Sequence, residues 1–377
     1  MVTFIRLGCQ CAIISVGLVL NSAWETQAEW VLNNQGTDGR YRIFIFSNEG
    51  LRLRPVTADK FQHVAWPSAI RHGELVYVFA SAYEDGGWRR IHRWKSSDRV
   101  SYEYDGVVFE ASDEERFGIG PAHVMFDPSA EYPFTMYYLV RGRDGPGNEI
   151  RVATSKDGAS WSRVGIAITK KIPFESGGLS VSYACKFEDR VFLFFHGYSR
   201  DLKRAVSLVA ESKNGIDFTN RRVILKPDGF GTTIMAKSGK KTAEFNLRQP
   251  KVGVPLVLFN GKNRQVVTPI IVEGIKVLFD SILLDDYEPG IAVSIYKNKI
   301  ELSYAKVRPD GSWIGIATGY GALGTVSAEY TSTFSAAHVS GPWQPLGEGL
   351  RFSPYFPEGE WSTENPEPIS SHSKCTR

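Results

Sequence analysis

Residues Ser155–Trp161 read SKDGASW, and two other segments of the chain repeat their pattern. The copies share serine at the first position, aspartate or asparagine at the third and an aromatic residue at the seventh; they are Ser96–Tyr102 (SSDRVSY) and Ser212–Phe218 (SKNGIDF). Aspartate or asparagine caps its own backbone turn and glycine adopts a positive φ, so the pattern is typical of a tight hairpin. The aromatic residue is expected to pack back between neighbouring sheets.

The three copies mark a repeated β unit. Their first residues lie 59 and 57 residues apart, and each copy is surrounded by short segments rich in Val, Ile, Phe and Tyr. Such segments, separated by turn residues, predict four strands per unit. Four-stranded sheets repeated around an axis form a β-propeller. We therefore predict an all-β chain.

The spacing of the units predicts the number of blades. First strands are expected near Ser68, Ala122 and Leu179, and again near Ile291, where the interval is twice as long. One divergent unit, over Asp228–Asp285, is expected to fill that interval. The prediction is a five-bladed β-propeller of four-stranded antiparallel blades over residues 29–357.

The two ends of the chain have different predicted roles. Tyr41–Phe46 is expected to pair with the end of the last blade and close the ring, and residues 358–377, which are polar and rich in Pro and Ser, to form a flexible C-terminal tail. Residues 1–28 read as a signal peptide, with Arg6 before the mostly apolar Leu7–Leu20 and small residues at Thr26-Gln27-Ala28. The apolar run is shorter than the roughly 20 residues that span a membrane. We expect a secreted or periplasmic protein with no membrane span in the mature chain.

The composition narrows the functional classes. The 377 residues include 44 Lys and Arg against 41 Asp and Glu, a net charge of +3, which is not the footprint of a nucleic-acid-binding protein. Signal cleavage would leave two of the four cysteines, Cys185 and Cys375, which does not indicate a disulfide framework. Cys185 is expected to be a small buried residue, with a Cys185–Cys375 disulfide as the alternative. We expect a monomer.

Three segments resemble the five-bladed propeller glycosidases of glycoside hydrolase families 43 and 32, which include arabinanases, xylosidases and fructosidases. They are Ile150–Trp161 (IRVATSKDGASW), Met136–Leu139 before it and Ser340-Gly341-Pro342-Trp343 near the end. The resemblance covers most of residues 60–345. It implies an active site on the propeller axis, at the starts of the innermost strands. There an Asp base, a Glu acid and a second Asp would flank a glycosidic bond.

The resemblance also indicates the catalytic candidates. Glu175, in Phe174–Gly178 (FESGG), matches the family's segment around the acid, while Asp286 and Glu288 lie in an acidic cluster before an expected strand. Each carboxylate can also be an ordinary loop residue. Trp66 stands before Pro67, where the family has Asp. The chain is therefore interpreted as a glycoside hydrolase or, alternatively, as a non-catalytic glycan-binding propeller or a scaffold for cell-envelope polysaccharide.

Further residues are expected to bind the substrate. Trp66 can stack on a sugar ring or plug the channel, and His123 can face a ligand or belong to the core. Because adjacent strands alternate in direction, three loops should share the face of the inner-strand starts; they contain Trp88, Arg141, Arg143, Arg200 and Arg204. Arginine suits carboxylate or sulfate groups, which predicts a preference for an acidic glycan over a neutral one. Ordinary surface charge is the alternative. No nucleotide or zinc motif is present, so we predict no cofactor and no metal.

Overall fold

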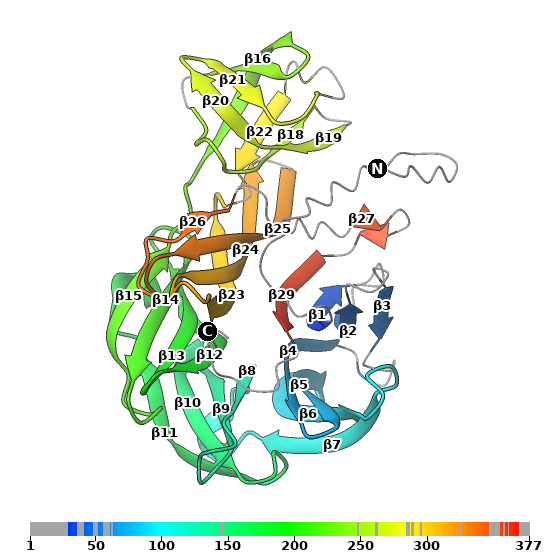
Figure 1. Ribbon diagram of the computed structural model, residues 1–377, viewed down its shortest axis with the longest axis vertical. Coiled ribbons are helices and arrows are strands. Elements are labelled where there is room, and N and C mark those ends of the chain that lie inside the picture. The colour runs from blue at the N-terminus through cyan, green and yellow to red at the C-terminus, as the bar shows by residue number, and fades with distance from the viewer. Residues whose placement is uncertain are drawn as a thin grey trace.

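The computed structural model of the protein describes residues 29–35, 41–47, 52–55, 61, 63–143, 147–246, 249–260, 263–283, 287, 290–294, 296–323, 326–346, 355–356, 359–360 and 362–368. The predicted signal peptide lies outside these residues. The described part is all-β apart from two short 3-10 helices, Asp113–Glu115 and Pro173–Glu175. No helix in it is long and apolar enough to cross a membrane. Figure 1 shows several groups of strands placed around a common centre, with one further lobe at the end of the long axis.

Four antiparallel meanders follow the predicted repeat. The first is a separate sheet of β4 (His63–His72), β5 (Leu75–Glu84), β6 (Gly87–Ser96) and β7 (Glu103–Glu110). The second contains β8 (Ile119–Phe126), β9 (Phe134–Arg141), β10 (Gly147–Ser155) and β11 (Trp161–Thr169). The third contains β12 (Gly178–Phe187), β13 (Arg190–Ser199), β14 (Arg204–Ser212) and β15 (Thr219–Leu225). The fourth contains β23 (Lys299–Val307), β24 (Trp313–Leu323), β25 (Val326–Ala336) and β26 (Gln344–Pro345).

Single backbone contacts join three of these meanders into one 12-stranded sheet. Gly147 of β10 pairs with Leu179 of β12, and Ala205 of β14 pairs in parallel with Lys299 of β23. Both pairings lie at the edge where the first strands begin. The first strands of consecutive meanders, β4, β8, β12 and β23, also contact one another in turn.

The two ends of the chain form a further four-stranded sheet. Its order is β29 (Ser362–Pro368), β1 (Glu29–Gln35), β2 (Tyr41–Ser47) and β3 (Arg52–Pro55). It differs from the prediction at two points. The C-terminal stretch expected to be a flexible tail contains β29, and that strand pairs with β1, whereas Tyr41–Ser47 pairs with β1 and β3. Two short strands, β27 (Tyr355–Phe356) and β28 (Gly359–Glu360), pair with each other.

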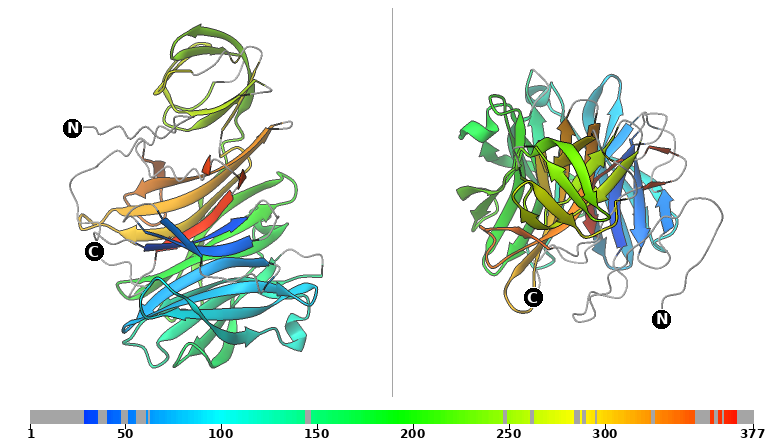
Figure 2. Two further views of the ribbon diagram at one scale, coloured as in Figure 1. Left: turned by 90° about the vertical axis from the view of Figure 1, so that its right-hand side faces the viewer. Right: turned by 90° about the horizontal axis from the view of Figure 1, so that it is seen from above.

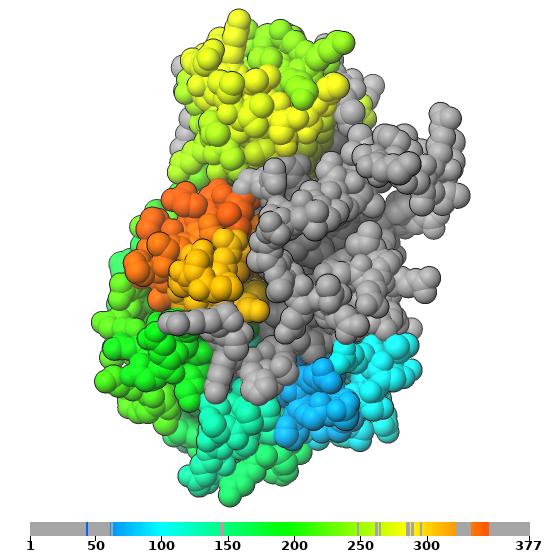
Figure 3. Space-filling view, in the orientation of Figure 1, coloured from blue at the N-terminus to red at the C-terminus, as the bar shows by residue number. Residues whose placement is uncertain are grey.

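Residues 231–294 form a lobe of their own. Its seven strands are β16 (Gly231–Gly239), β17 (Thr242–Phe245), β18 (Leu256–Phe259), β19 (Arg264–Val267), β20 (Pro269–Glu273), β21 (Lys276–Phe279) and β22 (Gly290–Ser294). Their order in the sheet is β19, β18, β22, β16, β17, β21 and β20. The edge strands β19 and β20 are separated by only one residue, so the sheet curves back on itself around twelve buried hydrophobic residues, among them Phe245, Phe279 and Tyr287. Figures 2 and 3 show the lobe as a distinct body beyond the rest of the chain.

This lobe corrects two predictions. Asp228–Asp285 was expected to be a divergent blade and Ile291 to start the last one. The structure instead places β22 in the lobe, and the next meander starts at Lys299. Asp228 holds the two connections of the lobe together, because it accepts hydrogen bonds from the Phe230 backbone and the Ser294 hydroxyl at 2.8 and 2.5 Å.

The three predicted hairpin turns are confirmed. Asp98, Asp157 and Asn214 each accept hydrogen bonds at 2.8–2.9 Å from backbone groups two and three residues ahead. The aromatic residues also pack as expected: Trp161 of β11 lies 6.2 Å from Phe79 of the preceding meander, centroid to centroid. Side-chain caps of this kind replace the backbone hydrogen bonds that a tight turn leaves unmade.

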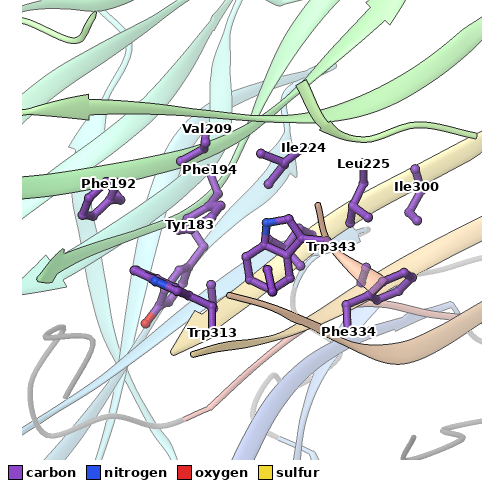
Figure 4. Close-up of a cluster of buried hydrophobic side chains, with 14 of the residues drawn as sticks. Tyr183, Phe192, Phe194, Val209, Ile224, Leu225, Ile300, Trp313, Phe334 and Trp343 are labelled. Carbon is purple, nitrogen blue, oxygen red and sulfur yellow. The ribbon is translucent and has the colours of Figure 1, made fainter. Parts of the chain in front are cut away.

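The hydrophobic core is divided among the spaces between consecutive sheets. One cluster joins β4–β7 to β8–β10, a second joins β8–β11 to β12–β14, and a third joins β12–β15 to β23–β25. Figure 4 shows the third, in which Tyr183, Phe194, Trp313 and Trp343 meet. Cys185, in β12, is fully buried there, as predicted, and it is also disulfide-bonded. Cys375, its alternative predicted partner, lies outside the described residues.

Candidate functional site

Four ring side chains meet at one edge of the sheet β4–β7. They are His63 and Trp66 near the start of β4, Tyr83 near the end of β5 and Trp88 near the start of β6. The ring centroids of Trp66 and Trp88 are 4.6 Å apart, those of Tyr83 and Trp88 are 5.5 Å apart, and those of His63 and Tyr83 are 5.9 Å apart. All four side chains are half-buried. We call these four residues the aromatic cluster.

The backbone at Trp66 is strained. Its φ is +57°, in the left-handed region that bulky residues rarely adopt, and it lies at a bulge of β4. A strained backbone conformation persists only where the surrounding structure imposes it, and such conformations are frequent at functional sites. The segment that enters β8 packs closely against β5 and β6. A side chain at Gly118 would collide with the carbonyl oxygen of Trp88, and one at Gly120 with the hydroxyl of Ser81.

Arg141 reaches the aromatic cluster from the neighbouring meander. It is the last residue of β9, and its guanidinium carbon lies 5.3 Å from the Trp66 ring centroid, within the range of a cation–π contact. Burial lowers the pKa of Arg141, but a guanidinium remains charged at physiological pH. The edge therefore offers partly exposed ring faces beside a positive group.

Glu175 lies in the interior of the fold. It ends the 3-10 helix Pro173–Glu175, has no exposed side-chain surface and accepts hydrogen bonds from the backbone of Lys171 and Ile172 at 2.6 and 3.1 Å. Arg221 of β15 donates to both carboxylate oxygens, at 2.8 and 2.7 Å. The carboxylate is thus paired and shielded from any ligand. These contacts support a structural role for Glu175 in place of the predicted catalytic one.

The preceding meander has an equivalent carboxylate. Glu115 ends the 3-10 helix Asp113–Glu115, has no exposed surface and accepts hydrogen bonds from the Ser112 backbone, the Tyr138 hydroxyl and Arg163 at 2.9, 2.8 and 2.8 Å. Burial raises the pKa of Glu115, but these hydrogen bonds, with that from Arg163 the largest, lower it to about 2. Because the arrangement recurs, both glutamates are best explained as anchors for the segment before a first strand.

His123 connects three first strands. Its Nδ1 lies 3.3 Å from the hydroxyl of Ser68 in β4, its Nε2 lies 3.1 Å from the carbonyl oxygen of Ala184 in β12, and its ring packs on Tyr183 with centroids 4.8 Å apart. The residue is only 3% exposed. Both ring nitrogens have partners within the core, which supports the core alternative for His123 over the ligand-facing one.

The other predicted residues are spread along the same edge or lie outside the described part. Arg143 and Arg200 are exposed in successive loops, and Arg204, at the start of β14, packs against Gly229 near the lobe. Asp286 and Glu288 are not among the described residues. Of the predicted site residues, the structure therefore brings together Trp66, Trp88 and Arg141.

The sequence reasoning missed one carboxylate near this edge. Glu301, in β23, lies 2.7 Å from the Lys299 ammonium and 3.5 Å from Nδ1 of the buried His196. Burial raises the pKa of Glu301, but Lys299 and then His196 lower it, and the net shift is downward. Its alternation with the apolar Ile300 and Leu302 was a signal that its side chain lies on the opposite face of the strand from theirs.

The described residues of the first strands hold few of the carboxyl groups that acid catalysis uses. A glycosidase needs one carboxylic acid with a raised pKa beside a second carboxylate. Among the described residues of β4, β8, β12 and β23, Glu301 is the only carboxylate, and each shifted carboxyl pKa in the described part of the chain is shifted downward. No group of three or more potential metal ligands occurs in that part either.

No family model and no curated protein matches the sequence. The structure is similar to solved structures of glycoside hydrolases. An endo-arabinase from Bacteroides thetaiotaomicron is 11% identical, with 76% of this chain and 80% of that chain covered and a TM-score of 0.45. The catalytic domain of the Coprinopsis cinerea GH62 α-L-arabinofuranosidase is 10% identical, with coverages of 77% and 69% and a TM-score of 0.44. A Podospora anserina α-L-arabinofuranosidase in complex with cellotriose is 11% identical, with coverages of 77% and 70% and a TM-score of 0.42.

The structural role of Glu175 can be tested by replacing it. Glu175→Gln should lower the free energy of unfolding by about 3–5 kcal/mol, because it leaves the charge of Arg221 without its partner. The measurement is urea unfolding followed by circular dichroism. Glu114→Gln is the matched control, since Glu114 is 81% exposed, and it should change stability by less than about 0.5 kcal/mol. A Glu175→Gln protein as stable as the wild type would contradict the assignment.

Proposed function

We propose that the protein is a carbohydrate-binding propeller with a glycoside hydrolase-like fold. The observation that carries this proposal is the aromatic cluster with Arg141 beside it. Flat, rigid rings present a large contact area at a small entropic cost and suit the apolar face of a sugar. The strained backbone of Trp66 is consistent with a ligand site.

The proposal extends to the architecture and location. The four meanders and the sheet β29-β1-β2-β3 would be five blades of one ring, closed where β29 pairs with β1. The lobe would be an insertion between the third and fourth meanders. We further propose that the chain is exported after cleavage near residue 28, which would place the site outside the cytoplasm, where structural polysaccharides occur.

Hydrolysis is the second candidate function, since the similar structures are glycoside hydrolases. It would require carboxylates such as Asp286 and Glu288, and the paired state of Glu175 weighs against it. A binding protein and a hydrolase differ in a simple readout, because only the hydrolase releases reducing ends from the bound glycan.

Removal of a cluster ring should weaken glycan binding. Trp88→Ala should lower affinity by about 10- to 100-fold, because burying an aromatic side chain contributes about 1.5–3 kcal/mol and 1.4 kcal/mol is tenfold. The measurement is isothermal titration calorimetry with polygalacturonate, an acidic polymer, and arabinan, a neutral one. Tyr132→Ala is the control, because Tyr132 is an exposed aromatic residue in the loop at the opposite end of β8 and β9. Equal affinities for wild type, Trp88→Ala and Tyr132→Ala, or no binding of either polymer, would refute the proposal.

We also propose that acidic glycans bind more tightly than neutral ones. Arg141→Gln should lower the affinity for polygalacturonate about tenfold or more, since a hydrogen bond to a charged group contributes about 1.5–3 kcal/mol. Binding of arabinan should change much less, and the response of polygalacturonate binding to salt should flatten. Arg71→Gln, at the opposite end of β4, removes the same charge as a control. Equal losses for both polymers would contradict a role for Arg141 in recognising charge.

A further inference from the structure

A second aromatic surface lies on the same edge, two meanders beyond the aromatic cluster. Tyr198, near the end of β13, is 42% exposed. Its ring lies against the backbone of Gly177, where a side chain would collide with it, and the Gly177 backbone donates a hydrogen bond to the Tyr198 carbonyl at 2.7 Å. The ring is therefore held in place on a rigid strand end while much of its surface faces solvent.

The turn after β13 presents a cation beside this ring. Arg200 is exposed, and its backbone nitrogen donates to the Ser176 hydroxyl at 3.2 Å. A second hydrogen bond, from the Leu202 backbone to the Ser199 hydroxyl at 3.3 Å, braces the turn. Tyr198 and Arg200 thus place an exposed aromatic residue and an exposed arginine two residues apart at one strand end.

Strand pairing connects the two surfaces along one edge. Arg141 pairs with Gly147, Gly147 with Leu179, and Leu179 with Gly197, the residue before Tyr198. Paired strands lie roughly 5 Å apart, so these three steps place Gly197, next to Tyr198, within roughly 15 Å of Arg141. That span is longer than one sugar ring.

We propose that Tyr198 and Arg200 form a second contact for a glycan chain whose other part lies on the aromatic cluster. The ligand is then an internal stretch of a polymer with several acidic sugars, and a single terminal sugar fills only one of the two contacts. This inference rests on the proposed function. Linking two weak contacts through one chain raises affinity without any change at either contact, provided that the chain spans both.

Varying the length of the glycan ligand distinguishes binding at one contact from binding at both. The probes are oligogalacturonides of increasing length, titrated calorimetrically into the full chain. For the wild type, affinity should rise about tenfold at the length that first spans both contacts and then level off. Tyr198→Ala should abolish this rise and leave the affinity for the shortest binding fragment unchanged. Tyr198→Phe should keep the rise, because the ring remains.

The outcomes distinguish this inference from the proposed function. If Tyr198→Ala keeps the full rise with length, or weakens all lengths equally, the second contact is refuted while binding at the aromatic cluster stands. If no fragment binds in a manner that depends on Trp88, the proposed function fails and the inference fails with it. Tyr132→Ala serves as the control for a lost surface aromatic, and thermal unfolding by circular dichroism verifies that each variant is folded.

Discussion

The fold depends on the packing of each four-stranded sheet against the sheets on both sides. A twisted sheet with two apolar faces has to bury both of them, and here large clusters such as the one around Trp313 and Trp343 fill the spaces between meanders. The first strand of each meander lies at the centre. This packing therefore brings the starts of β4, β8, β12 and β23 to one edge. The position of the candidate site is a consequence of that arrangement.

Polar groups at this edge serve two different purposes. Glu115 and Glu175 are buried, paired with Arg163 and Arg221, and fix the segments that lead into β8 and β12. A buried pair of this kind specifies geometry and is costly to break. The aromatic cluster remains partly exposed beside Arg141, and the surrounding glycines allow the backbone to approach it closely. The two buried ion pairs thus fix the segments around the aromatic cluster, which stays in contact with solvent beside the positive charge of Arg141.

The local turns could be predicted from the sequence, and the long-range assembly only in part. The Asp157 turn is encoded by adjacent residues, so its hydrogen bonds follow from the pattern. The lobe was mistaken for a blade because its insertion made the interval between units twice the repeat. The pairing of Glu175 could not be predicted, because its partner Arg221 is 46 residues away. The sequence Glu-x-x-Gly occurs at both Glu115–Gly118 and Glu175–Gly178. This repeat was the available signal that Glu175 anchors the segment before a first strand.

The most direct test of the account is a crystal structure of the protein with a bound acidic oligosaccharide. The account predicts a sugar ring stacked on Trp66 or Trp88, with its carboxylate toward Arg141 and the glycosidic bonds intact. An oligosaccharide bound elsewhere, with the aromatic cluster unoccupied, would contradict it.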